Sequence, residues 1–403
     1  MNLDQPILTL VENHPDLLDF LIVNGFDALK NKLLLKTMGK TMTLKKALTL
    51  RQIDVDAFSR KLEAFLAQGE SIDHSLNAPQ QEVAADVDIK GVLPCPIHMP
   101  LRDAITAATS EIAEAANIQI NMDLRSANLG ISWMTELPDI ITSAGFELFF
   151  GKEMQENYLK TGIYSGGDYP VNEDLKAHGA DLKDPLGHYH ILGLVPAIFI
   201  INKRVLNGRA IPTSWKMLLE PEYAASVAIP IGDLDLFNSI TLTIMAHHGE
   251  AGIRALGRST AVQLHPSQMT AHKTSQPLPL VSVAPYFFSQ MVNDPEIEVV
   301  WPSDGAIVSP IFMMAKMNKP HVRAITDQLA GKAIGEIFSL SGKFPSTAVG
   351  VDNQLSADQR LLFAGWDYLN RVDVEAELAR SEALFKEGFE EAKALFNSLE
   401  NPS

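Results

Sequence analysis

Cysteine is almost absent from this sequence: a single residue, Cys95, occurs among 403. A disulfide within the chain is therefore excluded. Basic residues are also scarce, at 33 against 49 acidic ones, and the formal net charge of -16 argues against nucleic acid or an anionic membrane as the main partner. The chain has no run of about eighteen apolar residues, so no membrane-inserted helix is expected.

The first residues, Met-Asn-Leu-Asp-Gln-Pro-Ile-Leu-Thr-Leu, lack the basic start, the long apolar core and the small-residue cleavage site of a secretory leader. Their absence predicts a cytoplasmic protein, or a periplasmic one if a leader has been removed. The remaining composition, 46% hydrophobic and 20% charged, is ordinary for a globular protein. The length suggests two or three domains, with ample residues for sizeable cores.

Strand and helix patterns alternate through the middle of the chain. Strands are expected at Val87–Leu93, Ile118–Met122, Glu147–Phe150, Ser226–Pro230, Leu280–Ala284 and Glu298–Trp301. Helices are expected at Leu101–Ala116, Leu137–Ser143, Ser214–Leu219, Leu236–Ala246, from Tyr286 onward, and over the acidic stretch 373–398. This alternation predicts an α/β fold of largely parallel sheets with helices on both faces, whose ligands bind beyond the carboxyl ends of the strands.

The longest apolar stretch of the chain is interrupted by Gly193 and Pro196, which both disfavour a helix interior. It predicts two short strands in series, His188–Leu194 and Ala197–Ile201, that lead from one lobe of the protein to another. The apolar strand Ile307–Met314 is expected to carry the chain back. A cleft between two lobes is a usual place for a small ligand to be enclosed.

The domain boundaries follow from these patterns. We expect a small helical domain at 1–68, a polar linker at 69–86, the first part of lobe 1 at 87–194, lobe 2 at 195–306, and the return to lobe 1 with C-terminal helices at 307–403.

The N-terminal domain is predicted to be all-α. An apolar stripe around Leu17 and Leu21 indicates a first helix, and Thr43 and Asp54 are expected to cap two more. The pairs His14-Pro15, Asn24-Gly25, Thr43-Leu44 and Ile53-Asp54 resemble a small helical domain of unknown function, related to one at the N-terminus of some iron–sulfur repair proteins. Because the usual nearby cysteine motif is missing, docking to a protein partner is the expected role.

Five further stretches have a specific order and spacing. They are Val195-Pro196 with Ile201-Asn202, Ile211–Tyr223, Ser226–Pro230, Asp304–Val308 and Gly342-Lys343-Phe344-Pro345. With them, residues 87–370 resemble the type 2 periplasmic binding proteins, in particular the ferric-iron-binding group of solute-binding proteins from ABC transporters. The resemblance implies two α/β lobes joined by two crossover strands, which close on a ligand by hinge motion. In iron-binding members adjacent tyrosines of the second lobe hold Fe(III), and the matching segment here keeps one phenol, Tyr286.

Candidate ligand contacts on lobe 1 follow its predicted strands. Cys95 precedes a helix, whose first amides stabilise a thiolate or an anion, and the Cys-x-x-His spacing to His98 suits a shared metal. Arg125 and Ser126 follow the second strand and suit a carboxylate or phosphate. The alternative for Cys95 is a buried residue that behaves as a small hydrophobe. For Arg125 and Ser126 the alternative is a structured turn whose polar groups are satisfied internally.

The other candidates lie at the first crossover and on lobe 2. His188 and His190 are two residues apart on a predicted strand, so both are expected on one face, opposite Tyr189. Asp235, His265, Tyr286 and Asp304 are expected to complete the site. Alternatively, the aspartates cap a helix or form a turn. The alternative for His188 and His190 is that they are hydrogen-bonded residues at the edge of a strand.

Three functions are compatible with these residues. The first is a solute-binding protein that closes over a small molecule or ion and works in cytoplasmic sensing or sequestration. The second is a metal site drawn from the cysteine, histidines and tyrosine, for which Fe or Zn is the candidate metal. The third is an enzyme with Cys95 as cleft nucleophile, as in proteins of this fold of the thiaminase type. A non-enzymatic role is the expectation, with no catalytic residue assigned.

Overall fold

The computed structural model folds as two units, Met1–Ala84 and Ala85–Ser403. It describes residues 3, 5–13, 17, 21, 26, 39–40, 42–50, 58, 85–125, 137–230, 234–263, 279–292 and 294–400.

The first unit is helical where it is described. Helices α1 (Ile7–Asn13) and α4 (Leu44–Leu50) share a small apolar core, in which the Phe26 ring meets Phe58 edge-on at 6.1 Å. The predicted cap at Thr43 is confirmed, since its hydroxyl accepts the Lys46 N–H at 3.3 Å. Asp54 and most of the first predicted helix lie outside the described residues.

The second unit is built on one mixed sheet. Its strands are β1 (Val87–Val92), β2 (Ile120–Arg125), β3 (Ile140–Ala144), β4 (His190–Asn202), β5 (Val227–Ile229), β6 (Thr260–Gln263), β7 (Val281–Pro285), β8 (Ile297–Val300), β9 (Ala306–Ala315) and β10 (Leu361–Leu362). The order is β2-β1-β3-β9-β4-β7-β5-β6, with β10 beside β9 and β8 beside β4. Strand β1 is parallel to β2 and β3, and β5 is parallel to β6 and β7.

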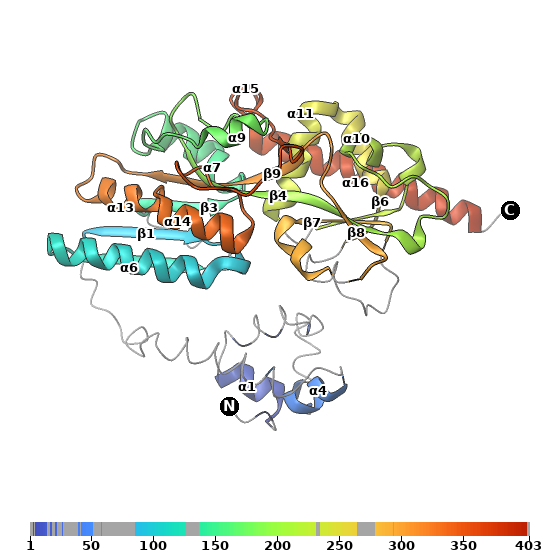
Figure 1. Cartoon of the computed structure of the whole chain (residues 1–403), viewed down its shortest axis with the longest axis horizontal. Helices are drawn as coiled ribbons and strands as arrows, with labels where there is room; N and C mark the ends of the chain where they lie inside the picture. Colours follow the sequence, from blue (N-terminus) through green and yellow to red (C-terminus); the bar gives the residue numbers. More distant parts are fainter. Residues whose placement is uncertain are drawn as a thin grey trace. The chain divides into compact units, whose positions relative to one another are not determined.

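Two long strands link these two parallel groups. Strands β4 and β9 are wholly or almost wholly buried, pair antiparallel with each other, and run side by side from one half of the unit to the other (Figure 1). Strand β9 pairs with β4 from His190 to Ala197, and β8 pairs with β4 from Phe199 onward. The predicted two-lobed fold with two crossover strands is therefore confirmed.

Three local predictions were wrong. The first crossover is one continuous strand instead of two, because Gly193 is absorbed as a bulge where the register shifts after Ile191. The expected helix at Leu137–Ser143 is strand β3, whose Ile140 and Ile141 are fully buried in the sheet. The expected strand at Glu147–Phe150 is helix α7 (Glu147–Phe150).

Helices cover the sheet at both ends. The first half carries η3 (Cys95–Ile97), α6 (His98–Ala116), α7, α8 (Lys152–Met154), η5 (Gln155–Leu159), α9 (Glu173–Ala177), α13 (Val322–Leu329), α14 (Lys332–Glu336), η9 (Ile337–Ser341) and α15 (Trp366–Leu369). The second half carries η6 (Lys203–Val205), α10 (Trp215–Leu218), η7 (Pro221–Tyr223), α11 (Leu234–Ser259) and η8 (Tyr286–Met291). The long α16 (Val374–Glu400) packs along α11 (Figure 1). Helix α11 is longer than predicted and continues past a kink at Gly249, which has φ 62°.

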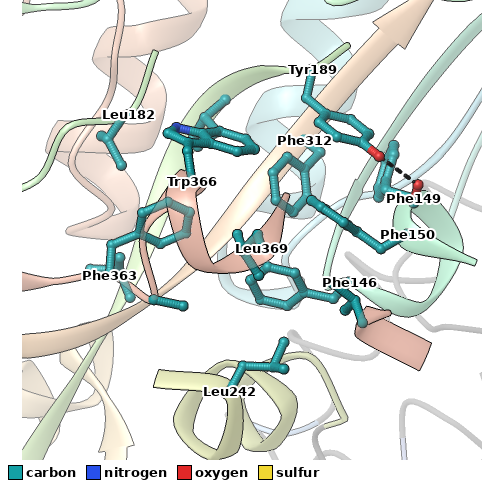
Figure 2. Packing of buried hydrophobic residues seen from close by; sticks show 14 of the residues in the cluster. Phe146, Phe149, Phe150, Leu182, Tyr189, Leu242, Phe312, Phe363, Trp366 and Leu369 are labelled. Atoms are coloured by element: carbon teal, nitrogen blue, oxygen red, sulfur yellow. Dashed lines mark hydrogen bonds between the residues drawn. The ribbon is translucent and has the colours of Figure 1, made fainter. Parts of the chain in front are cut away.

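An aromatic core joins α7 to the crossover strands. Phe146, Phe149 and Phe150 follow the i, i+3, i+4 spacing of one helix face and surround Phe312 of β9, with ring centroids 5.2 to 5.6 Å apart (Figure 2). The Tyr189 ring stacks on Phe150 at 4.7 Å. This face explains why the sequence 147–150 is helical, since a strand would send alternate rings to opposite sides.

Candidate ligand-binding site

The carboxyl ends of the first two strands lie side by side, as the predicted site requires. Val92 at the end of β1 is in register with Arg125 at the end of β2. Cys95 begins η3 directly after β1, and α6 follows from His98. The sequence order therefore places the predicted cysteine and arginine segments at one edge of the sheet.

His98 is the best-defined polar group of this edge. Its Nε2 lies 3.2 Å from the carbonyl oxygen of Leu124 on β2. Because a carbonyl only accepts, Nε2 carries the proton and Nδ1 is left with a lone pair. Burial lowers the pKa of His98, against the opposing effect of the Leu124 carbonyl, so the ring is neutral at neutral pH. A metal-binding histidine usually donates its other ring N–H to a backbone carbonyl, a carboxylate or a water in this way.

The facing segment comes from the other half of the sheet. Strand β7 ends at Pro285 and leads directly into η8, which begins with Tyr286. The half-buried Tyr286 ring contacts Trp301 edge-on, with 5.1 Å between centroids. An aromatic pair of this geometry holds the phenol in a defined direction.

Phe287 links the two halves. Its ring lies 6.5 Å from Phe344 and packs against the hydrophobic core that contains Ile97, Leu101 and Phe338. The residue next to Tyr286 therefore reaches the core beneath η3 and the start of α6. Ile97 and Leu101 of that core are neighbours in sequence of Cys95 and His98, so the Tyr286 segment adjoins the same core as the predicted lobe 1 residues.

The two histidines at the start of the crossover have different environments. His190, the first residue of β4, is 5% exposed, and burial lowers its pKa to about 4. His188 precedes the strand and donates its backbone N–H to Asp184 Oδ2 at 2.7 Å. Tyr189 between them is buried in the aromatic core and donates its hydroxyl to the Phe149 carbonyl at 2.8 Å. His190 lies about 20 Å along β4 from Pro196, at roughly 3.3 Å per residue.

Asp304 acts as a helix cap. Its carboxylate oxygens accept the backbone N–H groups of Trp215 at 3.0 Å and Lys216 at 3.1 Å, at the start of α10. The Trp215 indole N–H is bonded to the Gly305 carbonyl at 3.1 Å, and the predicted cap at Ser214 is confirmed, since its hydroxyl accepts the Met217 N–H at 3.2 Å. These contacts favour the capping alternative for Asp304 over ligand contact.

A substitution separates the two roles. We expect Asp304→Ala to lower the free energy of unfolding by about 1–2 kcal/mol, because two N–H groups of α10 lose their acceptor. Ligand affinity should stay unchanged. Chemical denaturation and a ligand titration on the same sample measure both quantities. A loss of affinity without a loss of stability would contradict the cap assignment.

The remaining predicted residues are described only in part or not at all. For Arg125 and Asp235 the backbone is placed, at the end of β2 and the start of α11. Ser126 and His265 lie outside the described residues. Within the described part of the chain, no group of three or more His, Cys, Asp or Glu side chains is arranged to hold a metal ion. Among those same residues, none forms a helix long and apolar enough to cross a membrane.

The fold and the facing segments define a two-lobed solute-binding protein. Residues 135–372 match the family described as bacterial extracellular solute-binding protein, and the chain belongs to this family. It is therefore a bacterial solute-binding protein. Residues 1–58 match a domain of unknown function, DUF1858. No curated protein matches the chain.

Solved structures show the same fold at low sequence identity. The Bordetella ferric binding protein is 14% identical, with a TM-score of 0.52, covering 75% of this chain and 99% of its own. Apo FutA2 from Synechocystis PCC6803 is 15% identical, with a TM-score of 0.52, covering 75% and 98%. An ABC transporter structure from Clostridium perfringens is 16% identical, with a TM-score of 0.50, covering 74% and 99%. At these identities the likeness establishes the fold alone.

The family match also corrects the predicted location. The cytoplasmic assignment was wrong, because the family to which the chain belongs is described as extracellular. The assignment rested only on the composition of the first residues of the sequence given.

Proposed function

We propose that the two lobes close over a small solute held between the η3–α6 segment and the start of η8. The observation that supports this proposal is the packing of Phe287, next to Tyr286, against Phe344 and the core that contains Ile97 and Leu101. The proposed contacts are Cys95, His98, Arg125 and Ser126 from lobe 1, and Asp235, His265 and Tyr286 from lobe 2.

The His98 and Tyr286 side chains indicate which hydrogen-bonding groups the solute carries. The neutral His98 ring presents a lone pair on Nδ1, and the Tyr286 phenol can donate or accept a hydrogen bond. A solute with a hydrogen-bond donor toward His98 and an acceptor toward Tyr286 fits both. Closure would remove these groups from water and strengthen both bonds.

A metal ion is the second candidate, with Fe or Zn as the expected element. It is supported by the orientation of His98, whose Nε2 is fixed on a carbonyl as in metal-binding histidines, and by the single phenol of Tyr286. The names of similar structures, among them the Bordetella ferric binding protein, are consistent with iron. Phe287 has no ligating atom, so a metal here needs a donor set different from two adjacent tyrosines.

The test is a thermal-shift screen of the full chain with Fe(III) citrate, Zn(II), phosphate and small organic acids and amides. A true ligand at about one hundred times its Kd stabilises the folded state by about 2.7 kcal/mol. For a unit of this size that corresponds to a rise in Tm of roughly 4 °C. Trp301 fluorescence should change with the same ligand, because its ring contacts Tyr286.

Variants of His98 and Tyr286 test whether the ligand binds in the cleft. We expect His98→Gln and Tyr286→Phe each to weaken the ligand at least tenfold, since each removes one contact made in the closed cleft. The control is His247→Gln, because the Nε2 of His247 is likewise 3.2 Å from a backbone carbonyl, that of Phe363, but lies on α11. Equal affinity in all three variants would reject the cleft as the binding site.

A further inference from the structure

The main chain at Trp301 is held in lobe 2 on both sides. Trp301 follows β8, which pairs with β4 along residues 199–202. The turn after it is fixed as well, because the Ser303 N–H donates to the Thr213 carbonyl at 2.7 Å and Asp304 caps α10. The position of the Trp301 backbone is therefore set by lobe 2 alone.

The indole of Trp301 makes its hydrogen bond to a segment of lobe 1. Its Nε1–H donates to the Arg360 carbonyl oxygen at 2.6 Å, and the same oxygen accepts the Ala306 N–H at 2.8 Å. The next residue, Leu361, donates its backbone N–H at 2.8 Å to the carbonyl of His178, directly after α9. The side chain of Trp301 thus joins lobe 2 to the part of lobe 1 that contains α9.

The Trp301 ring also packs against two different apolar clusters. One is the aromatic core around Phe312, and the other is the small lobe 2 cluster that contains Ile198, Ile200 and Ala284. Half of the ring surface is therefore used on each side of the lobe boundary. Together with the hydrogen bond at Nε1, these contacts restrict the indole to one orientation.

Tyr286 takes its own direction from this indole. The two rings meet edge to face, with 5.1 Å between centroids and 84° between planes. Among the residues that the structure describes, none hydrogen-bonds to the Tyr286 hydroxyl. Because no bond at the hydroxyl fixes the phenol, its direction follows from the packing of its ring, in which Trp301 is the aromatic partner.

We propose that Trp301 is a positioning residue, which holds the Tyr286 phenol at the angle that the solute meets and takes this angle from lobe 1 through the Arg360 carbonyl. Because the proposed function makes Tyr286 a ligand contact, this role rests on that function. A phenol that is already held in one direction loses less conformational entropy when a solute binds. The bond to Arg360 links that direction to the position of lobe 1, so the phenol responds to closure of the lobes.

The experiment measures how fast the Tyr286 ring flips, by NMR of the full chain with ¹³C-labelled tyrosine. Tyr286→Phe assigns its signal among those of the seven tyrosines. Trp301→Phe keeps a ring but has no N–H for the Arg360 carbonyl, and should speed the flip roughly threefold. Trp301→Leu removes the ring as well and should speed it roughly tenfold.

Arg360→Ala is the matched control. It removes an exposed side chain but keeps the carbonyl that accepts the indole N–H, so the Tyr286 flip should stay unchanged. Tyr169 and Tyr223, which are buried in other cores, serve as internal references. Their flip rates should be the same in all variants, whereas a general loosening of the fold would raise them too.

The effect on binding is measured with the probes of the thermal-shift screen. Whichever of Fe(III) citrate, Zn(II), phosphate or the organic acids and amides binds the native chain should bind Trp301→Leu about fivefold more weakly and Arg360→Ala equally well. Equal affinity for Trp301→Leu would overturn the proposal.

The flip rates decide the role of Trp301 without any ligand. An unchanged Tyr286 flip in Trp301→Phe and Trp301→Leu would overturn it, and so would an equal rise in the flips of Tyr169 and Tyr223. If no probe binds the native chain, the proposed function fails, and that failure is distinguishable because it leaves the flip rates as they are.

Discussion

Replacing Gly388 by alanine is expected to lower the free energy of unfolding by about 3 kcal/mol, at the upper end of the usual cost of overpacking. A Cβ on Gly388 of α16 would lie 2.0 Å from the Arg254 carbonyl oxygen of α11. On the other helix, a Cβ on Gly257 would lie 2.2 Å from the Phe385 carbonyl oxygen. The two helices thus approach backbone to backbone at a reciprocal pair of glycines, and neither contact can be relieved by a side-chain rotation.

The flanking ion pairs do not compensate for this loss. Arg254 bonds to Glu387 at 3.0 Å and Arg258 to Glu391 at 3.0 Å, but all four side chains are at least a third exposed, and such pairs contribute little. Urea unfolding followed by circular dichroism measures the change. Glu390→Ala, on the exposed face of the same helix, is the control and should change stability by less than about 0.5 kcal/mol. A similarly small effect of Gly388→Ala would show that α16 can shift along α11.

The sequence predicted long periodic elements well and short ones poorly. The helix expected at 373–398 is α16, and Leu384, Phe385 and Ala392 of its predicted apolar face are buried. Its length makes the helical period unmistakable. At 137–143 and 147–150 the runs are too short to show a period, and tertiary packing decided between helix and strand. The close approach of Gly388 to α11 could not be predicted, because it depends on which helix lies opposite.

For the candidate site, the sequence predicted only which segments lie at the same edge of the sheet. Because Cys95 and Arg125 follow parallel neighbouring strands, their segments had to share an edge, and the register of Val92 with Arg125 shows that they do. The role of Asp304 as cap of α10 could not be separated from ligand contact, because an aspartate in a turn suits both. For His190 the spacing from His188 predicted a shared face, but no pattern predicted that His190 begins β4 and is buried while His188 precedes the strand.

Asp139→Asn is expected to lower the free energy of unfolding by about 2–3 kcal/mol at pH 7, the second large effect. The Asp139 side chain is 6% exposed and pairs with Lys316 at 3.2 Å and with Lys319 at 2.5 Å. It also accepts the Asp88 N–H at 2.9 Å, and so ties the start of β3 to β1 and to the end of β9. The amide keeps the shape but leaves two ammonium groups without their carboxylate.

The effect should depend on pH in one direction. Burial raises the pKa of Asp139, but the Lys319 ammonium, the Asp88 N–H and the Lys316 ammonium outweigh it and hold the pKa below its ordinary value of 3.8. Just below that value the unfolded chain binds more protons at this carboxyl than the folded chain does, so stability rises with pH there. The contribution of Asp139 is therefore fully present above about pH 4 and is lost as the pH falls through its lowered pKa.

Denaturation of both proteins at a series of pH values tests this. The deficit of Asp139→Asn relative to the native chain should be equal at pH 7 and pH 5 and should shrink below about pH 3.8. Glu156→Gln is the control, because Glu156 pairs with Lys160 on the surface with more than half of each side chain exposed, and should cost less than about 0.5 kcal/mol at every pH. A deficit that is constant down to pH 3 would mean that the amide disturbs packing and that the charge of Asp139 contributes nothing.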